Sequence, residues 1–195
     1  MRTAASSSIT ASALIAATVA VWFPLFDFAQ GIRPVVSRGG APGLELKSAA
    51  FRDGGAIPQN FTCDGGDTSP ALTWNAPPAG AKSFVLIVDD PDAPSGTWVH
   101  WVVFNLPAGA RGLPEAVPRG EQIKGGGSQG RNDFPQIGYG GPCPPPGKPH
   151  RYFFKLYALD TQLNLTSGTT KNDVERAMQG HILAKAQIIG RYQRQ

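Results

Sequence analysis

The most informative stretch for predicting the fold is 82-KSFVLIVDDPDAPSGTWVHWVVFNLP-107. Residues 82–90 form a continuous apolar run that ends in two aspartates, as is typical of a strand buried on both faces. An Asp-Pro-Asp turn follows, and a second apolar run of the same kind, interrupted by His100, begins at Thr97. We therefore expect two core strands joined by a turn that is rich in carboxylates and prolines.

Further short strands separated by turn residues are expected on either side of this pair. The chain contains 24 glycines and 18 prolines, and 41% of its residues are hydrophobic, which favours a folded β-rich domain with many tight turns over disorder. The other strand candidates are residues 44–51, 70–77, 150–160 and a short closing strand at 188–193. No alternation of strands and helices and no internal repeat is present.

One helix is expected, at residues 172–187. Asn172 is the candidate N-cap, Glu175 follows three residues later, and Asp173 lies in the first turn, where a negative charge is favourable. The apolar residues 174, 178, 182 and 183 would form its buried stripe. The predicted fold is thus mostly β, a sandwich of antiparallel sheets with a C-terminal helix packed against it.

Residues 1–43 are expected to lie outside the folded domain, which would span residues 44–195. Arg2 precedes an uncharged stretch with an apolar centre at residues 11–26, which resembles an export signal or a single membrane anchor. A Gly/Pro/Arg-rich linker follows at residues 31–43. We therefore expect an exported protein, periplasmic or secreted, that is able to contact a membrane through this segment.

The charge pattern argues against nucleic acid as a partner. The formal net charge is +4, but basic and acidic residues are spread along the chain, with no basic stripe and no interleaved aromatics. Cys63 and Cys143 are too few for a disulfide scaffold or a zinc ribbon, although one bridge between them is plausible in an oxidising compartment.

The sequence matches several catalytic and metal-binding motifs only weakly. Residues 126–130 match G-x-S-x-G, but a glycine run precedes them and no helix-forming sequence follows, so a serine hydrolase is disfavoured. The same segment lacks the Lys-Ser/Thr pair of a P-loop. No histidines or cysteines have metal-ligand spacing, which leaves zinc binding only by convergence in the fold. Asp90 and Asp92 lie in one turn, which does not suit a glycosidase pair, and they are expected at least to cap that turn.

A small polar pocket is the remaining interpretation. In a regular strand Trp98, His100, Val102 and Phe104 would share one face, and His100 would lie at the strand entrance behind the acidic turn. His150 opens the last long strand directly after the Gly/Pro-rich loop 119–149. Two imidazoles and backbone N–H groups suit a phosphate-like anion, and a nearby carboxylate can orient an imidazole or accept an ammonium group.

Four segments together resemble the phosphatidylethanolamine-binding protein family, in particular its bacterial and archaeal branch, often labelled Raf kinase inhibitor-like. They are DPDAP at residue 90, HWVVFNLP at residue 100, GYGGPCPPPGKPHRYFFKLYALD at residue 138 and AMQGHILAKAQIIGRY at residue 177. FTCDGGDTSPALTW at residue 61 is also similar to that branch, and the resemblance extends over residues 44–192.

This resemblance implies a Greek-key β-sandwich with a small surface pocket for phosphate-bearing head groups or small anions. We expect no cofactor, no metal and no catalytic residue. The ligand-binding residues carried over by motif are Asp90, Pro91, Asp92, His100, Gly141, Pro144, Pro145, His150 and Tyr152. The expected function is that of a non-enzymatic binding protein, with a regulatory role. The alternative is an inhibitor of a protease or kinase that acts through surface loops. A third hypothesis is hydrolysis with His100 or His150 as general base, but the sequence shows no positioned nucleophile for it.

Overall fold

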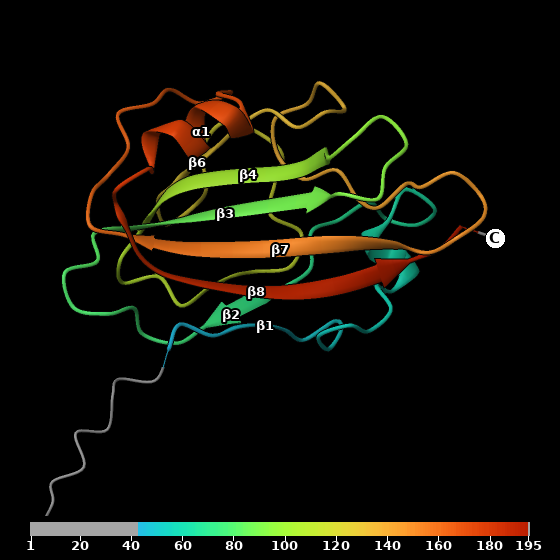
Figure 1. Ribbon diagram of the computed structural model, residues 1–195, viewed down its shortest axis with the longest axis horizontal. Coiled ribbons are helices and arrows are strands. Elements are labelled where there is room, and N and C mark those ends of the chain that lie inside the picture. The colour runs from blue at the N-terminus through green and yellow to red at the C-terminus, as the bar shows by residue number, and fades with distance from the viewer. Residues whose placement is uncertain (1–42, 195) are drawn as a thin grey trace, which may run out of the picture. The chain divides into compact units, whose positions relative to one another are not determined.

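The computed structural model describes residues 43–194, which form two antiparallel sheets and one short α-helix (Figure 1). The larger sheet has the strand order β6 (Ser128–Gln129), β4 (Trp98–Pro107), β3 (Ser83–Asp90), β7 (His150–Leu159) and β8 (Ile182–Tyr192). The smaller sheet has the order β1 (Leu46–Ser48), β2 (Leu72–Trp74) and β5 (Gly112–Leu113). A 3-10 helix spans Gln59–Phe61 and α1 spans Lys171–Ala177. The mostly-β class is confirmed, and the Greek-key connection stays a prediction.

Strand β3 is the centre of the larger sheet, and all eight of its residues are buried. Phe84, Leu86 and Val88 join the core between the two sheets. Val85 and Ile87 join a second core on the opposite face, beneath α1. The alternation follows from the period of two along a strand, and burial on both faces explains why this segment is apolar without interruption until its last two residues.

His100 occupies a β-bulge in β4. Val88 of β3 pairs with Trp101, whereas the next residue, Asp89, pairs with Val99, so the register shifts by one residue at His100. A bulge places an extra residue on one strand and redirects its side chain. The bulge therefore turns the imidazole toward the space between the sheets, at the end of the strand pair.

The bulge corrects the prediction that Trp98, His100, Val102 and Phe104 share one face. Trp101, directly after His100, belongs to the core between the sheets, while Val102 and Phe104 belong to the core beneath α1. The simple period of two fails at His100 because the bulge inserts one residue into the alternation.

The predicted helix 172–187 is wrong in its C-terminal part. Helix α1 ends at Ala177, and its N-cap is Thr170, which forms a capping box with Asp173, rather than Asn172. Gly180 then adopts a φ of +81°, which interrupts the helical path. The following residues pair with β7 as β8, because hydrogen bonding along a long neighbouring strand outweighs the local helical pattern.

The loop 119–149 is folded against the larger sheet at several points. It contributes β6, and the buried Gln129 side chain accepts a 2.7 Å hydrogen bond from Trp101 Nε1 and donates to the carbonyls of Pro118 and Gly120. The Gly140 N–H donates to the His100 carbonyl at 2.9 Å. These contacts give an irregular segment a defined position beside β4.

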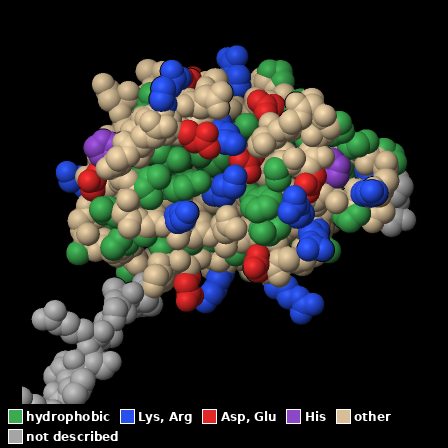
Figure 2. Space-filling view, viewed as in Figure 1, with side chains coloured by type: hydrophobic (Ala, Val, Ile, Leu, Met, Phe, Trp, Pro, Cys, Tyr) green, Lys and Arg blue, Asp and Glu red, His purple; other side chains and the backbone are tan. Residues whose placement is uncertain are grey.

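The predicted export signal or anchor lies outside the described residues. Within residues 43–194 there is no helix of the length and apolar character needed to cross a membrane. On the face shown in Figure 2, Lys and Arg side chains are interspersed with Asp and Glu around apolar side chains. This face therefore carries no extended field of one sign.

Candidate functional site

A cavity of about 250 Å³ lies where β3 ends and where β4 and β7 begin. These strand ends meet at one edge because neighbouring strands run antiparallel. The lining residues are Asp90, Ala93, Pro94, Ser95, Trp98, His100, Phe134, Cys143, Pro144, Pro145 and His150. The cavity thus brings together five of the nine ligand-binding residues predicted from the sequence: Asp90, His100, Pro144, Pro145 and His150.

Asp90 and His150 form a buried pair in the cavity. His150 Nδ1 lies 2.7 Å from Asp90 Oδ2, and both side chains are almost completely buried. The other carboxylate oxygen, Oδ1, accepts the backbone N–H of Asp92 at 2.8 Å. Because a carboxylate accepts hydrogen bonds, the pair places a proton on Nδ1 of His150 and leaves Nε2 as the ring nitrogen without an assigned partner.

His100 is held in a different way. Its Nδ1 donates to the Gly140 carbonyl over 2.7 Å, and its ring makes edge-to-face contacts with Phe134 and Tyr152 at centroid distances of 5.4 and 5.1 Å. Burial lowers the pKa of His100 below the usual range, against the weaker opposing effects of the Gly140 carbonyl and the Asp90 charge. His100 is therefore a neutral imidazole whose Nε2 is an acceptor.

Two buried polar atoms beside the cavity have no hydrogen-bond partner in the described part of the chain: Trp98 Nε1 and Tyr152 Oη. Trp98 lines the cavity, and its indole N–H is a donor. Tyr152 packs against His100 without lining the cavity. Burial, followed by the negative charge of Asp90, raises the pKa of the Tyr152 hydroxyl, which keeps it protonated.

Asp92 is predicted as a ligand-binding residue, but the structure places it outside the cavity lining. Its carboxylate accepts two side-chain hydrogen bonds from Arg151, at 2.8 Å from Nε and 2.7 Å from Nη2, and one from the Arg151 backbone at 2.9 Å. The Arg151 hydrogen bonds lower the pKa of Asp92 to about 2. Asp92 therefore ties the turn after β3 to the start of β7.

Gly141 and Pro91 also lie outside the lining. A Cβ on Gly141 would approach the Phe61 carbonyl oxygen to 2.6 Å and the Thr62 Cα to 2.8 Å, so only glycine fits there. Pro91 is exposed in the turn after β3. Both residues shape the backbone around the cavity.

A disulfide joins Cys63 to Cys143, whose side chain lines the cavity. The site also contains Trp98 and Phe134, which sequence reasoning did not assign to ligand binding. Trp98 lies two residues before His100 at the strand entrance, so its position was a usable signal, whereas Phe134 lies in an irregular loop without one. Among residues 43–194, no three His, Cys, Asp or Glu side chains lie close enough together to hold a metal ion.

Comparison with known proteins identifies the family. Residues 47–193 match the family model "Phosphatidylethanolamine-binding protein". A UPF0098 protein of Methanothermobacter thermautotrophicus is 54% identical over 151 residues, which is 77% of this chain and 99% of the relative. The UPF0098 protein YbcL of Escherichia coli K12 is 48% identical over 122 residues, 60% of this chain and 67% of that protein.

Two solved structures share the fold. The phosphatidylethanolamine-binding protein homolog CT736 of Chlamydia trachomatis has a TM-score of 0.72 and 42% identity, with 78% of this chain and 99% of that chain covered. The structure of E. coli YbcL, described as a member of the mammalian family, has a TM-score of 0.71, 38% identity and the same coverage. This chain belongs to the phosphatidylethanolamine-binding protein family, in its bacterial and archaeal branch.

Proposed function

We propose that this protein is a non-enzymatic binding protein whose cavity takes a phosphate-containing head group or a small anion. The observation that carries the proposal is the convergence of His100, His150 and Asp90 on one cavity from three different strands. Sites of this kind use a few convergent polar groups in a largely apolar lining.

The size of the cavity supports a small ligand. Its volume of about 250 Å³ lies below the ~300–1,000 Å³ that is usual for pockets holding drug-sized molecules. A head group fits such a space, whereas a whole lipid does not. If a phospholipid is the source, its acyl chains remain outside the cavity.

The polar groups favour a ligand that both accepts and donates hydrogen bonds. Trp98 Nε1 is a donor without a partner among residues 43–194, and the His150 imidazole, held on Asp90 through Nδ1, has a second ring nitrogen for hydrogen bonding. The neutral His100 supplies an acceptor through Nε2, and Asp90 supplies a negative charge. A phosphate oxygen and an ammonium group on one molecule match this mixed set better than a bare anion does.

Hydrolysis is less well supported than binding. Ser95 carries the only hydroxyl among the lining residues, and no hydrogen bond joins it to either imidazole. Nucleophilic catalysis requires a nucleophile within hydrogen-bond reach of its base. The absence of that contact favours a binding role for the Asp90–His150 pair.

Calorimetry with the wild-type chain and the His150→Ala variant tests the proposal. We expect phosphorylethanolamine to bind the wild type, and we expect the variant to lose at least about tenfold in affinity because it lacks an imidazole that lines the cavity and leaves the buried Asp90 carboxylate without its partner. His181→Ala is the matched control, since His181 pairs with Asp160 and is not among the cavity-lining residues. Equal affinity of the folded His150 variant and the wild type would contradict the proposal. Turnover of phosphoester or carboxylester substrates would contradict the non-enzymatic assignment.

The alternative function, inhibition of a protease or kinase through surface loops, makes a different prediction. An inhibitor would form a stoichiometric complex with its protein partner, and that complex would survive the His150→Ala substitution. Affinity capture with both forms from the source cell therefore separates the two functions.

A further inference from the structure

Residues 140–145, of which Cys143, Pro144 and Pro145 line the cavity, have an unusual backbone, and we call this segment the wall. Its sequence is Gly-Gly-Pro-Cys-Pro-Pro, and Pro146 follows directly. Proline has no backbone N–H, so Cys143 is the only residue between Gly141 and Gly147 that is able to donate a backbone hydrogen bond. A regular ladder of hydrogen bonds is therefore unable to hold this wall, although Cys143, Pro144 and Pro145 line the cavity.

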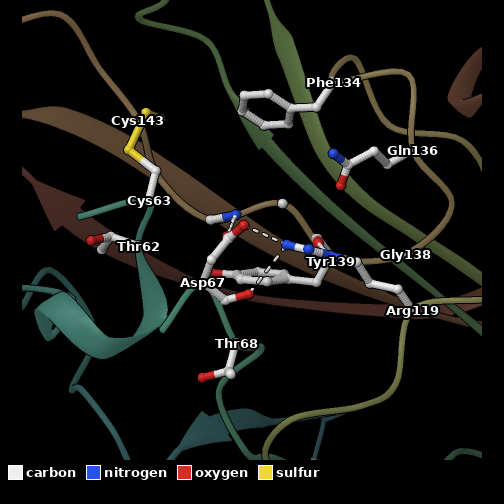
Figure 3. A network of polar contacts seen from close by, with 12 residues as sticks. Thr62, Cys63, Asp67, Thr68, Arg119, Phe134, Gln136, Gly138, Tyr139 and Cys143 are labelled. Carbon is white, nitrogen blue, oxygen red and sulfur yellow. Dashed lines mark hydrogen bonds and ion pairs between the residues drawn. A yellow bond between two sulfur atoms is a disulfide. The ribbon is translucent and has the colours of Figure 1, made fainter. Parts of the chain in front are cut away.

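The wall is attached instead to the segment 61–67. Cys143 forms the disulfide with Cys63, and the Cys63 N–H donates to the Pro142 carbonyl at 3.1 Å. The Gly141 N–H donates to Asp67 Oδ1 at 2.6 Å. Figure 3 shows the disulfide and the Asp67 side chain in one view, with the bond between Cys63 and Cys143 in yellow.

The Asp67 carboxylate, which accepts the Gly141 N–H through Oδ1, is bound through its other oxygen by Arg119. The Arg119 guanidinium donates through Nη2 to Asp67 Oδ2 and through Nε to the Tyr139 carbonyl at 2.9 Å, and in Figure 3 the two charged side chains point toward each other. The buried Tyr139 hydroxyl donates to the Phe61 carbonyl at 2.8 Å. These contacts make residues 61–67 and the start of the wall one continuous polar network.

The wall in turn positions a cavity side chain. The carbonyl of Gly140 accepts the hydrogen bond from Nδ1 of His100, and Gly140 packs so closely on Phe134 that a Cβ would lie 2.6 Å from Cδ2 of that ring. A shift of the wall therefore removes the partner that orients His100 and moves Phe134, which lines the same cavity.

We propose that Cys63 and Asp67 are positioning residues of the ligand cavity and that the Cys63–Cys143 disulfide is a redox-sensitive clasp for its proline-rich wall. This inference rests on the proposed function, because the clasp acts through the shape of the ligand site. Breaking the disulfide or the Asp67–Gly141 hydrogen bond loosens the wall, misplaces His100 and weakens ligand binding while the two sheets stay folded.

The clasp is accessible to a thiol reductant. Cys63 is exposed, and Cys143 is partly exposed at the cavity. A dithiol reductant attacks one sulfur as a thiolate and forms a mixed disulfide, and its second thiol closes a ring that releases the protein thiol. The net transfer is two electrons and two protons to the protein, which gains two thiols, while the dithiol becomes a cyclic disulfide. We expect the reductant to attack from the exposed Cys63 side of the disulfide.

Two variants of the full chain separate positioning from folding. Cys63→Ser combined with Cys143→Ser removes the clasp, and Asp67→Asn keeps the disulfide but weakens the anchor on Gly141. Asp64→Asn is the matched control in the same segment, since Asp64 bonds the C-terminal residues Tyr192 and Arg194 rather than the wall. Circular dichroism confirms at each temperature used that the variants are folded.

Calorimetry with inorganic phosphate and with phosphorylethanolamine gives the first readout. We expect about tenfold weaker binding for both variants and for the wild type after dithiothreitol treatment, and no change for Asp64→Asn. Dithiothreitol should not alter binding by the cysteine-free variant. Wild-type affinity in the folded cysteine-free and Asp67→Asn variants would overturn the inference.

Hydrogen exchange at the Gly140 and Gly141 amides gives a second readout that needs no ligand. We expect faster exchange after reduction and in both variants, because these amides bond to His100 and to Asp67. Unchanged exchange in the reduced protein overturns the clasp whatever the ligand is. If the oxidised wild type binds neither probe but exchange accelerates on reduction, the proposed ligand class fails while the positioning of the wall stands.

Discussion

Asp89 and Asp90 are adjacent in β3, both are buried, and they do opposite things. Asp90 faces the space between the sheets, where it pairs with His150 at the cavity. Asp89 faces the other side, where Lys155 lies 2.7 Å from Oδ1 and Lys171 lies 2.6 Å from Oδ2. The first carboxylate lines a cavity, and the second is paired with two lysines of the protein itself.

The different partners of Asp89 and Asp90 follow from their positions on opposite faces of β3. Side chains alternate between the two faces, so one residue of shift changes the environment completely. Lys171 is the first residue of α1, so the Asp89 cluster fastens the helix to the sheet. A buried carboxylate is therefore not evidence of a binding site until its partners are known.

Replacing Asp89 is expected to have the largest effect on stability. Asp89→Ala leaves two lysine ammonium groups beside a buried position, and removing one partner of such a cluster costs about 3 kcal/mol of unfolding free energy. Urea denaturation measures this loss. Phosphorylethanolamine affinity should stay within about twofold of wild type at temperatures where the variant is folded. A loss of affinity without a loss of stability would reverse the assignment of the two aspartates.

Replacing Asp92 is expected to have a smaller, pH-dependent effect. The pKa of Asp92 is lowered to about 2, against an ordinary value near 3.9 in the unfolded chain, so its stabilising effect is complete above about pH 4–5 and is lost as the pH falls through about 2. Asp92→Asn should therefore cost roughly 1 kcal/mol at pH 6, because the bond to Arg151 is bidentate but partly exposed. Denaturation curves of both proteins should converge near pH 2. A difference that does not depend on pH would show that the Asp92 charge plays no part.

The smallest expected effect concerns the protonation of His100, which NMR spectroscopy can observe. Because burial lowers the pKa of His100, the folded protein should keep this imidazole neutral to a lower pH than the unfolded chain does, with its proton on Nδ1. Imidazole ¹⁵N shifts measured by NMR between pH 5 and 8 report both properties. The urea-unfolded protein, in which a histidine titrates near 6.5, is the reference. Titration of folded His100 at that same value would remove the contrast between a neutral His100 and the carboxylate-paired His150.

Much of the cavity was predictable because its residues lie at strand ends. The Asp-Pro-Asp turn followed by His100, and His150 opening the last long strand, place both imidazoles and Asp90 at one edge of an antiparallel sheet. The separation of Asp90 from Asp92 was not predictable, because it depends on the fork that Arg151 makes with Asp92 from a neighbouring strand.

In the C-terminal region the secondary structure was not predictable from the sequence. Residues 182–187 fit a helical stripe in the sequence, but β7 offers a free edge along which they pair as β8. Ile182 and Leu183, expected in that buried stripe, are 43% and 41% exposed. Local periodicity describes one element at a time and contains no information about an available neighbouring strand.

The sequence by itself determined the β-rich class, the two central strands and the candidate histidines, because apolar runs and turn residues act locally. Only the tertiary structure decided that His100 occupies a bulge, that Asp89 and Asp90 face different partners, and that Cys63 and Asp67 hold the cavity wall. These features depend on contacts between residues far apart in the chain, such as Cys63 and Cys143, which are separated by 80 residues. Contacts of that range are set by how the sheets pack and not by any local pattern.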